Sequence, residues 1–187
     1  MKKILVMGAL CLFTAGTLMA QGVGVGIKGG LNFASLDADT DASSRTGIHF
    51  GAYAKVMPTD KFGVQAELFY SVQGASDFGN VKATVDANYV NIPILLRISP
   101  VPILNLHAGP QFGILLSADQ DGTDIKDTLN GSDLSLAVGA GLDLPMGLNL
   151  TLRYIKGLSD ISDDNTDSIK NNIFQISVGF DLIGLGK

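Results

Sequence analysis

Along most of this chain, apolar side chains occupy every second position in runs of about ten residues. The clearest run extends from Tyr89 to Ile98, where one face is entirely aliphatic: Val90, Ile92, Ile94, Leu96 and Ile98. A period of two places alternate residues on opposite sides of a β-strand. The pattern predicts eight strands, at residues 22–36, 46–57, 62–74, 87–98, 104–117, 132–144, 148–158 and 172–183.

The predicted strands and their connections have the dimensions of a membrane barrel. Each strand contains the roughly 9–11 residues that a tilted strand needs to cross a bilayer. Tight turns at 58–61, 99–102 and 145–147 alternate with longer loops at 37–45, 75–86, 118–131 and 159–171. Short periplasmic turns, longer external loops and an even number of strands are typical of outer-membrane barrels. We therefore predict an all-β, eight-stranded antiparallel transmembrane up-and-down β-barrel with its apolar face toward lipid.

A soluble barrel or sandwich would show the same alternation, with its apolar face turned inward. In that arrangement the odd-numbered residues of 63–73 and 135–143 would face water, and these residues carry mostly small and amide side chains. Strands of this kind aggregate through their edges in water. Small and paired polar side chains instead suit the narrow interior of an eight-stranded barrel, which favours the membrane interpretation.

The first twenty residues follow a different pattern. Lys2 and Lys3 precede an apolar stretch from Ile4 to Phe13, and small residues lead to Ala20. This order is typical of a secretory signal peptide, and the stretch is shorter than the ~20 residues of a spanning helix. We expect a signal peptide at 1–20, an outer-membrane β-barrel domain at 21–187, and export to the cell outer membrane.

Composition narrows the function classes further. The single cysteine, Cys11, lies in the predicted leader, so the mature chain has no disulfide or thiolate metal site. Without Lys2 and Lys3 the chain keeps 11 Lys and Arg against 18 Asp and Glu, a net charge of −7 that argues against nucleic-acid binding. Because 13 of the 18 acidic residues fall in the four longer loops, we expect an acidic external collar.

Several segments resemble one family. The most specific are residues 89–96, which read YVNIPILL, and 109–118, which read GPQFGILLSA; segments 26–32, 138–144, 153–161 and 172–180 are also similar. Together they resemble the small porin-like outer-membrane β-barrel family of Bacteroidetes, which includes PorT-like proteins. The resemblance spans the mature chain and implies an outer-membrane barrel, although family members mostly lack an assigned activity. The chain departs from such barrels by continuing past Phe180 and Leu182 instead of ending on an aromatic residue.

The inward faces carry nine charged or imidazole side chains, which form a candidate polar network in the lumen: Lys28, His49, Lys55, Glu67, Arg97, His107, Asp143, Arg153 and Asp181. Four cations here face three carboxylates. Each unpaired charge in a narrow lumen would cost several kcal/mol, so we expect the groups to pair or to hold water. A paired network would close and rigidify the barrel, and the alternative is a narrow path whose ion selectivity these residues set.

Other candidate chemistry is weak. His49 and His107 are the only histidines, and no third ligand completes a metal site. The chain has no G-x-S-x-G motif for a hydrolytic triad. Asp-rich segments at 37–41 and 119–124 lack the closing Glu of a calcium loop, which leaves weak divalent binding as an alternative to a solvated loop. Alternating glycines at 22–26 and 139–141 are better explained by space inside a crowded barrel than by phosphate binding.

These observations lead to three functional hypotheses. The first is a non-enzymatic structural or interaction barrel with a mostly closed polar lumen, with no catalytic residues, cofactor or metal. The second is a narrow porin or transporter for ions or small solutes, and the third is an accessory barrel of a protein secretion apparatus, as PorT-like membership implies. The expected partners are outer-membrane lipid and lipopolysaccharide, the barrel insertion machinery and an unidentified loop-binding protein, with no nucleic acid.

Overall fold

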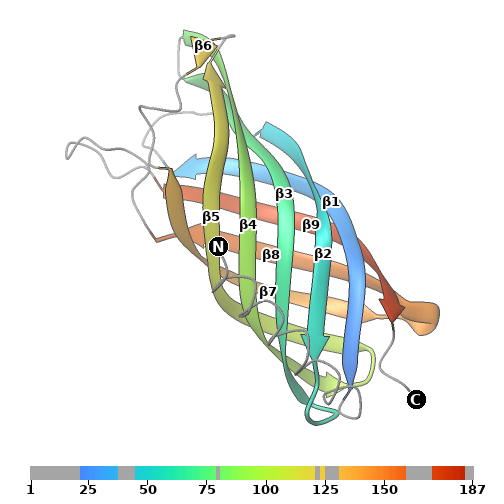
Figure 1. Cartoon of the computed structure of the whole chain (residues 1–187). Coiled ribbons are helices and arrows are strands. Elements are labelled where there is room, and N and C mark those ends of the chain that lie inside the picture. Colours follow the sequence, from blue (N-terminus) through green and yellow to red (C-terminus); the bar gives the residue numbers. More distant parts are fainter. Residues whose placement is uncertain are drawn as a thin grey trace, which may run out of the picture.

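Eight long antiparallel strands close into a barrel, which confirms the predicted fold (Figure 1). The computed structural model describes residues 22–37, 45–78, 81–120, 123–124, 131–158 and 170–183. The barrel strands are β1 (Val23–Asp37), β2 (Arg45–Val56), β3 (Phe62–Phe78), β4 (Val81–Val101), β5 (Leu104–Gln120), β7 (Ser132–Asp143), β8 (Leu148–Gly157) and β9 (Lys170–Ile183). A two-residue strand, β6 (Thr123–Asp124), pairs only with the end of β5.

Every barrel strand pairs with the strands that precede and follow it in the chain, as the up-and-down topology requires. The ring closes where β1 pairs with β9, with Leu31 opposite Ile176 and Lys28 opposite Gly179. β3 and β8 are four strands apart in either direction around this ring, so they form opposed walls. We call the end with the short connections the turn end and the other the loop end.

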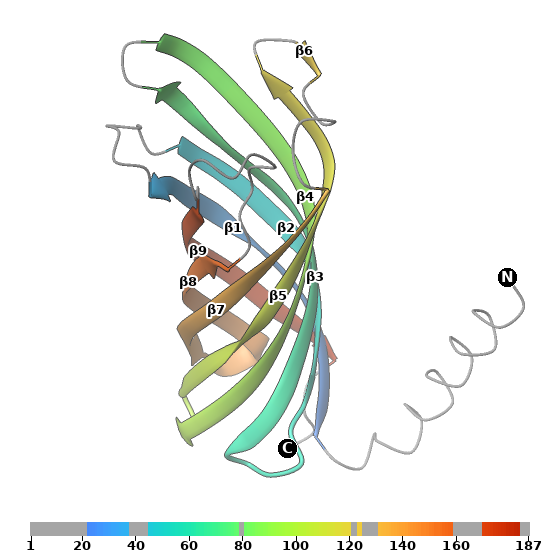
Figure 2. The same ribbon diagram turned by 90° about the vertical axis from the view of Figure 1, so that its left-hand side faces the viewer.

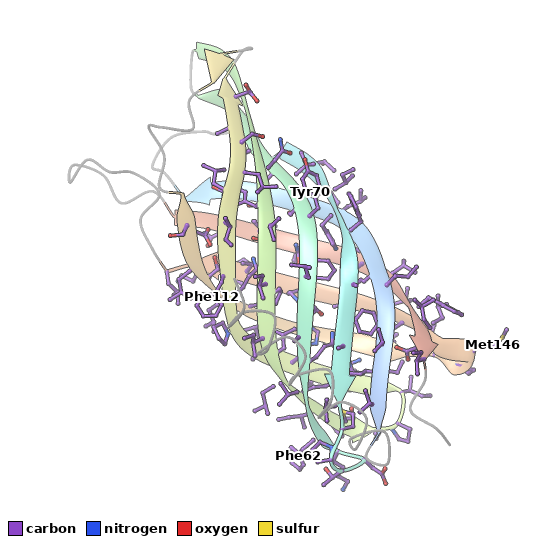
Figure 3. All side chains as sticks on the ribbon, in the orientation of Figure 1. Phe62, Tyr70, Phe112 and Met146 are labelled. Atoms are coloured by element: carbon purple, nitrogen blue, oxygen red, sulfur yellow. The ribbon has the colours of Figure 1, made fainter. Side chains whose placement is uncertain are left out.

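The outer wall is apolar, as the alternation predicts. Phe62, Tyr70 and Phe112 project from the outside of the barrel (Figure 3), and Phe62 and Phe112 are about half exposed. Aliphatic residues such as Leu68 and Leu152 are likewise exposed along the strands. Such a continuous apolar surface is stable only against lipid, because monomeric soluble proteins rarely expose large apolar patches.

Inward glycines allow the sheet to curl into a narrow ring. A Cβ atom at Gly30, Gly51 or Gly109 would collide with a backbone carbonyl oxygen of the neighbouring strand. Glycine therefore lets adjacent strands approach on the concave face, which is how sheets acquire strong curvature.

Two of the three predicted tight turns are confirmed. Residues 58–61 join β2 to β3, and a short 3-10 turn, η2 (Pro145–Gly147), joins β7 to β8. Met146 and Gly147 adopt positive φ values of 65° and 83°, and the Met146 side chain stands at the tip of the turn (Figure 3). The third tight turn also joins the expected strands but lies later than the predicted 99–102, because β4 continues through Val101 and the chain reverses at 102–103. Pro100 fits within β4 because the pairing with β5 is irregular between Ile98 and Val101.

The loop predicted at 75–86 is wrong. β3 and β4 continue as a paired hairpin from Gly74 opposite Asp86 to Phe78 opposite Val81. β5 likewise runs to Gln120, beyond the predicted strand end at residue 117, and pairs with β6. β3, β4 and β5 thus reach past the other strands at the loop end (Figure 2). Backbone pairing continues here although the side chains no longer alternate, because alternation is required only where one face meets lipid.

Other predictions fall outside the described residues. The signal peptide at 1–20 does so entirely, and so do most of the loops predicted at 37–45, 118–131 and 159–171, most of the Asp-rich segment at 37–41, and residues 121–122 of the segment at 119–124. Within the part of the chain that the structure covers, no helix is long and apolar enough to span a bilayer.

Candidate functional site

The structure directs all nine predicted lumen residues into the barrel. Seven of them are buried, with at most 7% of their surface exposed: Lys28, His49, Lys55, Glu67, Arg97, His107 and Arg153. The side chains of Asp143 and Asp181 are 25% and 16% exposed, because they lie at the turn end. The period of two in the sequence thus predicted correctly that these residues face inward. Which residue pairs with which is seen only in the structure.

Glu67 on β3 is the centre of the charged cluster. Arg153 on the opposed strand β8 binds it with two hydrogen bonds, from Nη1 to Oε2 at 2.6 Å and from Nη2 to Oε1 at 2.9 Å. Lys28 on β1 donates to the same Oε1 at 3.1 Å. All three side chains are almost fully buried, and one carboxylate thus holds two cations from different walls. Charge-assisted, two-pronged pairs of this kind are among the strongest hydrogen bonds in proteins.

From Glu67 the hydrogen bonds continue around the lumen and return to it. Arg153 donates through Nε to His107 Nε2 at 3.3 Å, and His107 contacts the Asn105 amide oxygen at 3.2 Å. Asn105 donates to Asp143 at 3.1 Å, which also pairs with Arg97. The circuit closes because Arg97 donates to Gln65, and Gln65 donates to Glu67. We call this the lumen circuit, and it consists of Gln65, Glu67, Arg97, Asn105, His107, Asp143 and Arg153.

A second cluster lies beside the circuit toward the turn end. Asp181 accepts hydrogen bonds from Lys55 at 2.7 Å and from the Tyr53 hydroxyl at 2.6 Å. The amide of Asn149 donates to the same hydroxyl at 2.7 Å. The Lys28 ammonium lies 5.2 Å from the centre of the Tyr53 ring, a cation–π distance that joins this cluster to Glu67.

Asn32 organises a third, uncharged cluster. Its amide nitrogen donates to Ser71 Oγ at 2.8 Å, and its oxygen contacts both His49 Nδ1 at 2.7 Å and Gln175 Nε2 at 2.8 Å. The other ring nitrogen of His49 lies 2.8 Å from Ser177 Oγ. β1, β2, β3 and β9 are thereby tied together by side chains inside the lumen.

Apolar side chains also meet across the interior. Leu95 on β4, Ala137 on β7, Ile155 on β8 and Ile173 on β9 form one fully buried cluster. β4 and β9 are opposed walls, so this contact closes the barrel from side to side.

The alternating glycines provide space for large neighbours, as predicted. A Cβ at Gly139 would lie 2.5 Å from His107 Nε2, and one at Gly141 would lie 2.7 Å from Asn105 Nδ2. A Cβ at Gly24 would similarly lie 2.6 Å from Lys55 Cε. The long inward side chains therefore lie flat over glycines of the adjacent strand.

An open cavity occupies the turn end. This cavity, which we call the turn-end mouth, has a volume of about 1160 Å³. It is lined by the three hairpin ends at this side of the barrel, residues 57–61, 99–103 and 143–147. The charged side chains that reach it from the lumen are Lys55, Arg97, Asp143 and Asp181, which form two ion pairs. The mouth thus opens onto the edge of the paired network.

The two histidines have no nitrogen left for a metal. His49 uses both ring nitrogens toward Asn32 and Ser177, and His107 uses both toward Asn105 and Arg153. In the described ranges, no three His, Cys, Asp or Glu side chains gather as metal ligands.

Sequence reasoning missed several members of these clusters. Gln65, Asn105, Tyr53 and Asn149 are inward by the same period of two, yet their roles depend on neighbours from other strands. Asp133 was also missed, although its position before Leu134 on β7 places it on the inner face. Adding every inward amide and hydroxyl to the charged set would have found the first four, and applying period two to the first residues of β7 would have found Asp133.

Solved structures with the same architecture are outer-membrane barrels. The attachment invasion locus protein Ail of Yersinia pestis matches with a TM-score of 0.55 and 12% identity, covering 87% of this chain and 99% of that one. Neisserial surface protein A gives a TM-score of 0.57 at 12% identity, over 86% and 97% of the two chains. OprG of Pseudomonas aeruginosa gives 0.50 at 14% identity, over 86% and 94%. These likenesses show the fold.

A curated sequence also matches part of the chain. NAD(P)H-hydrate epimerase of Levilactobacillus brevis is 28% identical over 87 residues, which is 46% of this chain. The match spans only 40% of the length of that protein, so it carries no assignment.

The family model covers nearly the whole molecule. The model that describes the outer membrane protein beta-barrel domain matches residues 5–181, which include all eight barrel strands up to Asp181. This match agrees with the closed barrel, its apolar outer wall and its polar interior. The chain belongs to the outer membrane protein beta-barrel domain family.

Proposed function

We propose that this protein is a non-enzymatic outer-membrane barrel with a closed lumen, which acts as a structural element or presents its loop end to a partner. The observation that supports the proposal most directly is the lumen circuit, in which seven side chains hydrogen-bond in a ring between opposed walls. The buried apolar cluster of Leu95, Ala137, Ile155 and Ile173 adds a second barrier. A barrel filled in this way has rigid walls and no continuous path for water.

The proposal also covers the export of the protein and the partners of its outer wall and loop end. The leader at 1–20 directs export, and lipid, lipopolysaccharide and the insertion machinery are the partners of the apolar wall. The hairpin of β3 and β4 and the end of β5 reach furthest at the loop end, so a protein partner would contact these strands first.

A narrow ion path is the second candidate, and the turn-end mouth favours it. This cavity leads from solvent to two ion pairs, Lys55 with Asp181 and Arg97 with Asp143, whose carboxylates are partly exposed. Ions entering from this end would meet those pairs first. Conduction would then require the circuit to open beyond Arg97.

Single-channel recording separates the two candidates. The mature chain is refolded and its folded state verified by heat-dependent gel mobility, and current is then measured in planar bilayers. A folded barrel that stays silent, also when Arg97 is replaced by Gln, supports the closed lumen. Steady channels whose ion selectivity changes in Arg97→Gln would overturn it and establish a pore.

A further inference from the structure

Asp133 differs from the other carboxylates on the inner face. Glu67 pairs with Lys28 and Arg153, Asp143 with Arg97, and Asp181 with Lys55. Asp133 has no cation within salt-bridge distance among the residues that the structure describes. The Ser135 hydroxyl donates a hydrogen bond to its Oδ1 at 3.2 Å. Asp133 is partly buried, and a carboxylate in such a place without a counter-charge is costly. It is neutralised either by a proton or by a cation from solution.

Two acceptor oxygens approach each other above the backbone of Gly113. Asn91 on β4, Gly113 on β5 and Asp133 on β7 lie side by side in one row of the sheet. Since Gly113 has no side chain, its two neighbours lean over it. A point at the missing Cβ lies 2.8 Å from Asp133 Oδ1 and 3.1 Å from Asn91 Oδ1. Two acceptor oxygens therefore converge over the same gap, a carboxylate on one side and an amide oxygen on the other.

Oxygen ligands of this kind suit hard cations. Calcium binds carboxylate and amide oxygens together with water, and sodium accepts the same ligands. The row lies near the start of β7 at the loop end, so an ion reaches it from the side opposite the turn-end mouth. Asn91 is almost completely buried, with 3% of its surface exposed, so its amide is part of the wall and not a solvated loop.

We infer that Asp133 and Asn91 form a site for a hard cation over Gly113, at the loop end of the lumen. The cation supplies the counter-charge that this carboxylate lacks and joins β4 to β7 across β5. Bound in this way, it stabilises the loop end of the barrel as the Glu67 cluster stabilises the middle.

Thermal unfolding of the refolded barrel tests the site. The midpoint is measured in tetramethylammonium buffer of constant ionic strength while calcium chloride, or separately sodium chloride, replaces the organic cation. The wild-type midpoint rises to a plateau with at least one of the two ions. Asp133→Asn removes most of this rise, whereas Asp119→Asn, which changes an exposed carboxylate at the same end, retains it. A rise that survives in Asp133→Asn but not in Asp119→Asn assigns the ion to the Asp-rich segment and overturns the inference, as does a midpoint that no added ion moves.

A gain-of-function variant keeps the test decisive if Asp133→Asn folds poorly. Asn91→Asp places two carboxylates over Gly113, so it lowers the midpoint without the cation and reduces the half-saturating calcium concentration at least tenfold. If Asn91 instead donates a hydrogen bond to Asp133, the same variant is destabilised at every cation concentration. That result would contradict the site.

Terbium luminescence locates the ion. The protein has four tyrosines and no tryptophan, and the buried Tyr89 lies two residues before Asn91 on the same inward face of β4. Terbium, used as a calcium analogue, is therefore excited through Tyr89 when bound at this site. Tyr89→Phe lowers the sensitised emission while leaving the cation-dependent midpoint shift in place, and Tyr154→Phe on the outer wall serves as the control. Unchanged emission in Tyr89→Phe, or in Asp133→Asn, overturns the inference.

Discussion

Arg153 and Glu67 join two walls of the barrel that share no backbone hydrogen bond. Both terminal guanidinium nitrogens of Arg153, Nη1 and Nη2, donate to the carboxylate, at 2.6 and 2.9 Å, although the residues are 86 positions apart in sequence. The pair therefore acts as a cross-brace in the interior, where surrounding side chains keep water away and strengthen the attraction.

Replacing Glu67 should be the most damaging change to the interior. Glu67→Gln keeps the size of the side chain but leaves Lys28 and Arg153 buried without their carboxylate. Breaking a buried pair in this way costs about 3–5 kcal/mol, so we expect the free energy of unfolding in urea to fall by that order. Asp60→Asn, at an exposed position in the turn between β2 and β3, is the control. Equal stability of Glu67→Gln and wild type would show that the cluster does not hold the barrel together.

A methyl group at Gly139 should disturb the lumen circuit. The added Cβ of Gly139→Ala would lie 2.5 Å from both His107 Nε2 and the Leu152 carbonyl oxygen, so either the imidazole moves away from Arg153 or the strands separate. Overpacking of this kind costs about 1–3 kcal/mol, measurable as a lower unfolding midpoint. Gly131→Ala is a matched control, because nothing lies within 4 Å of its Cβ. A similar decrease of the unfolding midpoint in both variants would mean that glycine is needed at position 139 for a reason other than space.

A charged side chain on the outer wall should destabilise the barrel more in the middle of the bilayer than at its surface. Leu152 is exposed in the middle of β8, so Leu152→Arg places a cation in hydrocarbon and costs about 2–4 kcal/mol if the strand spans the bilayer. Met146→Arg changes a side chain that is 91% exposed at the tip of η2, and it should fold into lipid vesicles as well as wild type. Equal yields of folded Leu152→Arg and Met146→Arg would be inconsistent with lipid contact at Leu152.

Export can be checked on the cellular protein. If the leader is removed after Ala20, the protein in the outer-membrane fraction begins at Gln21 and its mass lacks the first twenty residues. Intact-mass measurement and N-terminal sequencing read this directly. An uncut chain in that fraction would contradict the signal peptide.

The sequence predicted most of the barrel because one physical rule acts on every strand. Lipid on one side and a narrow interior on the other impose period two, so Leu152 faces outward and Arg153 inward without reference to any other residue. Outside the lipid-facing part of the wall, strands can pair without alternating side chains, so the alternation no longer marks where a strand ends. The pairing of β3 with β4 accordingly extends through 75–86, where a loop was predicted. Similarly, β4 continues through Pro100, where its pairing with β5 is irregular.

Side-chain partners in the interior could not be predicted in the same way. Period two identifies Glu67 as inward, but whether it meets Arg153 or Lys55 depends on the tilt and stagger of strands that are distant in sequence. Gln65 and Asn105 were treated as polar filling, yet both are links of the circuit. Asp133 escaped notice because it stands at the very start of its strand, beside a predicted loop.

The lumen circuit also has a consequence for the order of assembly. Its members come from five different strands, and Arg153 on β8 is among the last to be added along the chain. Arg97 meets its partners on β3 and β7 earlier along the chain, but Glu67 has only Lys28 as its cation until β8 brings Arg153. A barrel without its last two strands would therefore hold an incomplete charge network, which is completed only as the ring closes.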